Sequence, residues 1–106
     1  MGETQTHGEL VNSILVYPKF QTNGRFWKQH VGIFETPNGM KIKIGISGMA
    51  DITGVWNGRR VEIECKVKKD YQKPEQKLWQ QMIERFGGLY ILARSIEDVE
   101  RGLGVS

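Results

Sequence analysis

An aspartate, a glutamate and a lysine occur on two short segments that a tight turn separates. Asn57-Gly58 is typical of a two-residue β-hairpin turn in which both central residues take positive φ. The antiparallel register that this turn sets brings Asp51 directly opposite Glu64. Opposed residues have Cβ atoms roughly 4.5 to 5.5 Å apart, so two carboxylates there repel each other unless a cation lies between them. The spacing therefore predicts a site for a divalent cation.

Lys66 lies on the same face as Glu62 and Glu64, because strand residues two apart point to the same side. The opposite face is apolar and suits a hydrophobic core: Val61, Ile63 and Cys65, with Ile52 on the paired strand. The charged face has two interpretations. It is a metal-dependent phosphodiesterase site, or it is a solvated sheet face on which Lys66 neutralises the carboxylates and Glu62 pairs with Thr53.

Length and composition indicate one globular domain, residues 1–106, with a modest core. The hydrophobic fraction of 39% and the charged fraction of 25% are ordinary for such a domain. The sequence has no apolar stretch long enough for a bilayer and no signal-peptide pattern, so we expect a cytoplasmic protein without a membrane partner. Cys65 is the one cysteine, which excludes an internal disulfide and a thiolate zinc site.

Basic side chains concentrate in the middle of the chain, although the net charge is only +3. Residues 17–46 contain five lysines and arginines and the single acid Glu35, and a second group of lysines follows Glu64. Backbone phosphates of a nucleic acid suit this distribution, and the residues expected to contact them are Lys28, Lys68 and Lys69. His30 either contacts phosphate or is an ordinary strand histidine. The alternative for each lysine is a role in solubility or in protecting a strand edge.

Helix and strand signals alternate along the first half of the chain. Thr6 and Glu9 have the spacing of a capping box, and apolar residues then recur at helical intervals, which predicts a helix over 7–17. Residues 26–34 are expected to form a strand or an extended segment, and residues 40–46 alternate like a strand after a turn at 37–39. The hairpin with the acidic residues follows.

The second half predicts a helix, a strand and a short helix. Pro74 suits the first turn of a helix that ends at Gly87-Gly88. Its apolar residues form one stripe: Leu78, Trp79, Met82, Ile83 and Phe86. Residues 89–93 read as a buried strand, and a last helix begins at Ser95 and ends near Gly102. A strand, helix and strand in succession favour a crossover. We therefore expect an α/β domain whose mixed β-sheet has helices on both faces.

The order of these motifs resembles the VRR-Nuc domain of the PD-(D/E)xK nuclease superfamily. The resemblance covers about residues 25–100 and depends on an ordered set: Phe26-Trp27-Lys28 with Val31-Gly32, Gly48, Asp51, Glu64-Cys65-Lys66, Gln76, Gly87-Gly88 and Arg94-Ser95-Ile96-Glu97-Asp98. The proline of the PD dipeptide is replaced by Ala50, but the aspartate is retained. The D…ExK core alone is short and occurs by chance, whereas the whole set is far more specific.

The resemblance implies a restriction-endonuclease-like fold and a Mg²⁺ or Mn²⁺ ion held by Asp51, Glu64 and the backbone carbonyl of Cys65. Lys66 would orient or help to deprotonate the attacking water, and Gln76 would position that water or the lysine; the alternative for Gln76 is a solvated residue of the first helical turn. Glu9 is the candidate for a further metal ligand from the first helix, but its place in the capping box is a complete structural explanation by itself.

The function that the resemblance implies is that of an endonuclease without a small-molecule cofactor, working in a bacterial or phage-infected cell. Stand-alone members resemble junction-resolving enzymes, so we expect a homodimer that cuts branched or four-way (Holliday) junction DNA. Two alternatives remain open. The chain could be a non-catalytic nucleic-acid-binding module, or a nuclease subunit that depends on a helicase or recombination partner.

Overall fold

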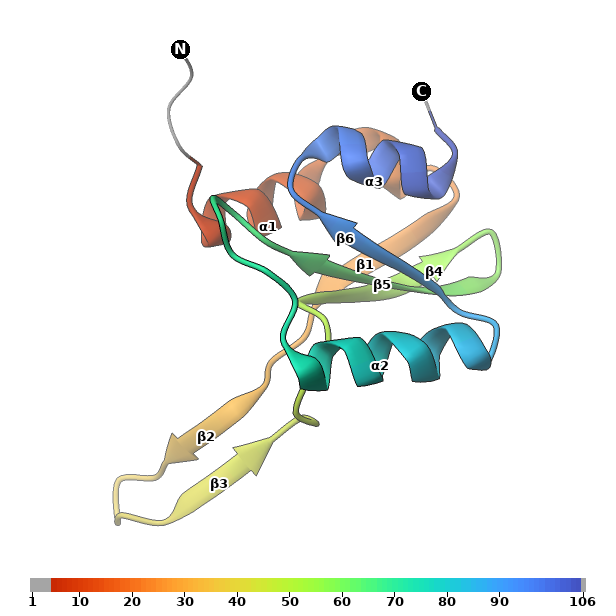
Figure 1. Cartoon of the computed structure of the whole chain (residues 1–106). Coiled ribbons are helices and arrows are strands. Elements are labelled where there is room, and N and C mark those ends of the chain that lie inside the picture. Colours follow the sequence, from red (N-terminus) through yellow and green to blue (C-terminus); the bar gives the residue numbers. More distant parts are fainter. Residues whose placement is uncertain (1–4, 106) are drawn as a thin grey trace.

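A four-stranded sheet in the order β1-β4-β5-β6 organises the structure, a computed structural model that describes residues 5–105 (Figure 1). Its strands are β1 (Gly24–Lys28), β4 (Ile52–Trp56), β5 (Arg59–Cys65) and β6 (Leu89–Ala93). β1, β4 and β5 pair antiparallel, whereas β6 runs parallel to β5. The predicted mixed sheet is therefore confirmed.

Helices cover both faces of this sheet, as predicted. α1 (His7–Val16) and α3 (Ile96–Leu103) lie on one face, and α2 (Pro74–Arg85), which connects β5 to β6, lies on the other (Figure 1). A short 3-10 helix, η1 (Pro18–Gln21), follows α1. Both sides of the predicted capping box form at the start of α1, and Ser95 caps α3 by accepting the Asp98 N–H. Among residues 5–105, no helix is long and apolar enough to cross a membrane.

The core lies between the sheet and the pair α1 and α3. Val61, Ile63 and Cys65 of β5 are buried together with apolar residues of both helices: Leu10, Val11, Ile14 and Val99. The alternation along β5 directs these side chains to one side, so the predicted apolar face is confirmed.

The hairpin turn forms where the sequence indicates. Asn57 and Gly58 take φ values of 50° and 76°, the combination that a type I′ turn requires. Trp56 pairs with Arg59, which is the register that a turn centred on these two residues sets. The last pair of the ladder is Ile52 with Ile63, so Asp51 lies one residue beyond it, on the side where the register would place it opposite Glu64.

The predicted helix forms as α2, but its apolar stripe is only partly buried. Ile83 is buried, but Leu78 and Phe86 are 66% and 76% exposed. The sheet face beneath α2 carries the polar residues of β5, so the helix turns hydrogen-bonding side chains toward it. Gln76 and Trp79 make these bonds, which is why part of the apolar stripe faces outward.

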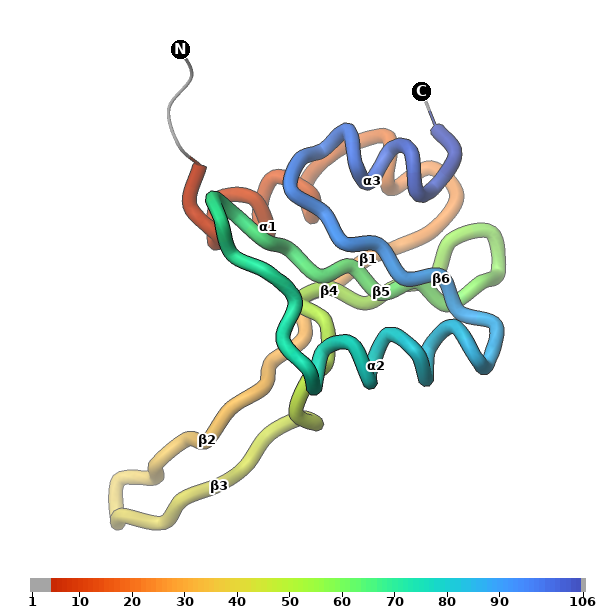
Figure 2. The backbone as a smooth tube through the Cα atoms, in the orientation of Figure 1, coloured from red at the N-terminus to blue at the C-terminus, as the bar shows by residue number. Residues whose placement is uncertain are grey.

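The segment 26–34 is two strands and not one. β1 ends at Lys28, and β2 (Gly32–Glu35) pairs only with β3 (Lys41–Ile44) in a separate two-stranded sheet. This hairpin, which we call the β2–β3 arm, projects away from the central sheet (Figures 1 and 2). The turn predicted at residues 37–39 forms its tip, where Gly39 takes a φ of 86°.

Candidate active site

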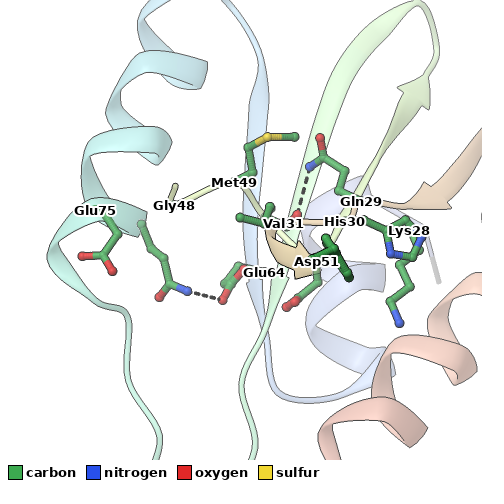
Figure 3. A pocket seen from close by; sticks show the side chains of 12 residues that line it. Lys28, Gln29, His30, Val31, Gly48, Met49, Asp51, Glu64 and Glu75 are labelled. Atoms are coloured by element: carbon green, nitrogen blue, oxygen red, sulfur yellow. Dashed lines mark hydrogen bonds between the residues drawn. The ribbon is translucent and has the colours of Figure 1, made fainter. Parts of the chain in front are cut away.

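The two carboxylates predicted to converge lie at the same end of the central hairpin. Asp51 directly precedes β4 and Glu64 is the penultimate residue of β5, and both line one cavity of about 400 Å³. Figure 3 shows the two side chains beside one another in this cavity. The Cys65 backbone N–H donates a hydrogen bond to Asp51 Oδ2 at 2.8 Å, which ties the aspartate to β5. The convergence on which the metal-site hypothesis depends is present.

Glu64 is buried, with only 3% of its surface exposed. Its Oε2 accepts a hydrogen bond from Gln76 Nε2 at 2.9 Å and lies 3.1 Å from Lys66 Nζ. Its Oε1 is also buried and has no hydrogen-bond partner. Glu62 and Lys66 are as inaccessible as Glu64, so the interpretation of this face as a solvated sheet surface is wrong.

The surroundings of Glu64 hold its pKa well above the ordinary value. Burial is the largest cause, the negative charge of Asp51 is the next, and the nearby Lys66 ammonium opposes them only in part; together they raise the pKa of Glu64 from 4.5 to about 7. Two carboxylates with one ammonium leave the site short of positive charge. A cation between Asp51 and Glu64 would relieve both the repulsion and the desolvation.

Lys66 completes the predicted group. Its ammonium is buried, within 3.1 Å of Glu64 and within 3.7 Å of Asp70. The Tyr71 backbone N–H, and after it the ammonium groups of Lys66 and Lys73, hold the pKa of the Asp70 carboxyl below its usual range. Lys66 is therefore held between two acids, and it contacts the cavity of Asp51 only through Glu64, because its own side chain lines a smaller, separate cavity.

Gln76 is fixed at both ends of its amide. Nε2 donates to Glu64, and Oε1 accepts the Lys73 N–H at 2.8 Å. The neighbouring Gly48 packs directly against the start of α2, because a Cβ on Gly48 would lie 2.2 Å from the Glu75 carbonyl oxygen. The first turn of α2 thus forms one wall of the cavity, and Gln76 is half-buried instead of solvated.

The backbone N–H of Cys65 faces the segment that carries Asp51. Its N–H points toward Asp51, whereas the N–H of Lys66 points the opposite way, to the Ala93 carbonyl on β6. Because the N–H and C=O of one strand residue face the same neighbour, the Cys65 carbonyl is expected on the Asp51 edge. The thiol points into the core, and burial, followed by Asp51 and Glu64, raises its pKa far above the usual range.

The first helix reaches the site through His7. Glu9 accepts the Thr6 N–H at 2.8 Å in the capping box, and this bond lowers the pKa of its carboxyl. His7 Nε2 lies 3.1 Å from Asp51 Oδ2. The sequence analysis missed His7, because the only signal was its place after the N-cap Thr6, which does not reveal a contact 44 residues away.

The predicted phosphate-contacting residues fall into two groups. Lys28 and His30 line the same cavity as Asp51 and Glu64. Lys68 and Lys69 are exposed in the loop that follows Lys66, and Lys68 lines a different, smaller cavity together with Lys66 and Arg94. Only the first group shares the cavity of the two carboxylates.

A buried polar network behind the cavity was not foreseen. Glu62 is fully buried and accepts hydrogen bonds from Trp79 Nε1 at 2.7 Å and from Gln29 Nε2 at 3.1 Å. Gln29 also donates through Nε2 to the Ala50 carbonyl and through its backbone N–H to the Asp51 carbonyl. The network therefore connects α2, β5 and the segment that carries Asp51. The sequence signal was the position of Glu62 on the same face as Glu64.

The donor set suits a hard divalent cation that keeps part of its water shell. Within residues 5–105, no group of three or more His, Cys, Asp and Glu side chains is arranged to hold a metal. Mg²⁺, however, is usually bound through one or two carboxylates plus water and substrate oxygens. Asp51, the unpaired Oε1 of Glu64 and the Cys65 carbonyl fit that pattern.

A search with the sequence matches no protein family and no curated protein.

Proposed function

We propose that the protein is a Mg²⁺- or Mn²⁺-dependent DNA endonuclease of the VRR-Nuc type, with a restriction-endonuclease-like fold. The observation that carries the proposal is the buried carboxylate of Glu64, which leaves one oxygen unpaired beside Asp51 while the other contacts Lys66. A buried acid without a full set of partners is costly to a fold, so its presence in a cavity favours a functional role.

The chemistry follows from what phosphodiester hydrolysis requires. Negative charge builds up on the phosphate and on the leaving oxygen during in-line attack by water. A divalent ion held by Asp51, Glu64 and the Cys65 carbonyl would supply Lewis-acid stabilisation of that charge. Lys66 Nζ, held by Glu64, can donate a hydrogen bond to the attacking water and orient it. Gln76 keeps Glu64 in place. The burial of Glu64 and Lys66 limits the access of other water molecules to these two side chains.

DNA is the proposed substrate because cationic residues flank the cavity. Lys28 and His30 would contact phosphates on either side of the scissile bond, whereas Lys68 and Lys69 would extend this contact beyond Lys66. We propose a cytoplasmic homodimer that selects branched or four-way junction DNA, because cutting two symmetric strands requires two sites. The fold has no room for a separate sequence-reading domain within the described residues.

The test is a cleavage assay with linear duplex, flap, fork and four-way junction DNA in Mg²⁺ or Mn²⁺, with chelator as control. Lys66→Ala should abolish cleavage and keep DNA binding, and Asp51→Ala should also weaken Mn²⁺ binding measured by calorimetry. Lys19→Ala is the matched control and should cleave normally, because Lys19 is an exposed lysine that pairs with Glu100 of α3 and does not line the cavity.

Two results would contradict the proposal. Wild-type protein that cuts none of these substrates with either ion would favour a binding module in which Lys66 and Glu64 form only an ion pair. Lys66→Ala cutting at the wild-type rate would remove the role of the lysine. Cleavage that appears only after addition of host or phage extract would instead identify a subunit that depends on a partner protein.

A further inference from the structure

The β2–β3 arm exposes apolar side chains that the rest of the protein does not cover. Seven of its eight strand residues are exposed, the exception being the half-buried Gly32. Ile33 is 70% exposed and Phe34 is 48% exposed. A two-stranded hairpin that packs on nothing is at best marginally stable in water. The arm therefore needs a partner to cover it.

The pairing of β2 with β3 separates the arm into two chemically different faces. Gly32 pairs with Ile44 and Phe34 with Ile42, so one face is apolar and carries no charge. The other face, formed by the alternate pairs, is mixed and mainly basic: Ile33 with Lys43, and Glu35 with Lys41. Opposed residues in an antiparallel pair point to the same side, which keeps the two sets apart.

The apolar face borders the candidate active site. Phe34 lines the cavity that contains Asp51 and Glu64, and Lys28 and His30 line it near the base of the arm. At that base, a Cβ on Gly45 would lie 2.6 Å from the His30 carbonyl oxygen, and Gly45 takes a φ of 77°. The two chain segments at the base of the arm are therefore in direct contact, and this contact sets the direction in which the arm projects from the cavity.

We propose that the β2–β3 arm is a DNA-binding ribbon that lies in a groove of the duplex next to the scissile phosphate. Paired strands are about 4.8 Å apart, so a two-stranded ribbon fits a major groove about 12 Å wide. Phe34, Ile42 and Ile44 face the groove floor, where thymine methyl groups offer apolar contacts. Lys41 and Lys43 extend their aliphatic stems around the edge of the ribbon to the phosphates of the groove walls.

DNA explains the arm better than a second copy of the chain does. The apolar face has three large side chains, which together offer far less than the roughly 800 Å² per partner that a stable protein interface buries. A contact between two arms through this face would also leave Lys43, which lies opposite Ile33, without an anion to bind. The proposal rests on the proposed function for the place of DNA at the cavity, but DNA binding can be measured without cleavage.

The experiment is a salt titration of DNA binding by fluorescence anisotropy, in chelator so that no strand is cut. Each phosphate contact contributes about 0.9 to the slope of log Kobs against log salt, so Lys41→Ala/Lys43→Ala should make the slope about 1.8 shallower. The matched control is Lys19→Ala/Arg101→Ala, which also removes two positive charges. These residues contact Glu100 and Asp98 of α3, across the sheet from α2, and the slope should not change.

A second pair of variants tests the apolar face. Phe34→Ser and Ile42→Ser should weaken binding at every salt concentration without changing the slope, because they remove no charge. Both residues are exposed, so thermal unfolding should remain at the wild-type temperature.

The proposal is overturned if Lys41→Ala/Lys43→Ala keeps the wild-type slope, or if the wild-type protein binds neither junction nor duplex DNA. It is also overturned if the serine variants convert a dimer into a monomer in light scattering while DNA affinity per subunit stays unchanged, because the arm would then be a contact between copies. A protein that binds through the arm but never cuts would contradict the nuclease proposal alone. If the lysine variant and the serine variants of the arm all cut DNA at the wild-type rate, only the proposal for the arm is contradicted.

Discussion

Replacing Glu64 with glutamine should remove a pH-dependent loss of stability from the metal-free protein. The pKa of Glu64 is about 7 in the folded protein, against 4.5 ordinarily. The folded state therefore binds this proton more tightly than the unfolded chain does. Its contribution to stability is fully present below pH 4.5 and is lost as the pH rises through 7. A difference of 2.5 pKa units corresponds to about 3 kcal/mol.

The measurement is urea unfolding of wild type and Glu64→Gln in chelator, at pH values from about 4 to about 9. The free energy of unfolding of wild type, minus that of the variant, should fall with rising pH across this range, by about 3 kcal/mol at most, because groups that do not interact with Glu64 contribute equally in both proteins. The control is Glu84→Gln, at an exposed acid on α2, and its free energy of unfolding should depend on pH as that of wild type does. Saturating Mn²⁺ should stabilise wild type above pH 7 and not Glu64→Gln. A difference that does not change with pH would refute the electrostatic account of the site.

Three further substitutions test the supports of the cavity. Gly48→Ala should lower the free energy of unfolding, measured in urea, by about 2 to 4 kcal/mol, because the new methyl group clashes with α2 at a residue whose φ is 92°. Its control, Gly58→Ala, has a φ of 76° but meets no atom, so it should lower that free energy by only about 1 to 2 kcal/mol. Equal losses in the two variants would contradict the packing of Gly48 against α2. Trp79→Phe should lower the free energy of unfolding by about 1.5 to 3 kcal/mol, because it removes a 2.7 Å hydrogen bond to the buried carboxylate of Glu62. A melting temperature equal to that of wild type would show that this hydrogen bond contributes nothing to stability. Glu9→Gln should leave Mn²⁺ affinity unchanged in calorimetry, because glutamine also completes a capping box, and a large loss of affinity would restore Glu9 as a ligand.

The parts of the fold set by local rules could be predicted from the sequence. The turn at Asn57-Gly58 determined the hairpin register, and the period of two along β5 separated the apolar face from the face with Glu64 and Lys66. The capping box at Thr6 marked the start of α1. In each case the deciding interaction joins residues that are near one another in the chain or directly opposed across a turn.

The parts set by distant contacts could not be predicted. The polar face of β5 is buried because α2 folds back over it, and the match between Trp79 and Glu62 is visible only once those elements meet. The contact of His7 with Asp51 depends on the docking of α1 against the sheet. The alternation in β3 predicted a strand correctly but gave no information on its partner, so the projecting arm was missed.

The burial of Cys65 has a practical consequence for labelling experiments. Its sulfur lies in the core, and the chain contains no other cysteine. A thiol engineered at the tip of the arm, such as Asn38→Cys, would thus be the single point at which maleimide dyes or nitroxide labels attach. The approach of the arm to fluorophore-tagged oligonucleotides could be followed by energy transfer on the otherwise native chain.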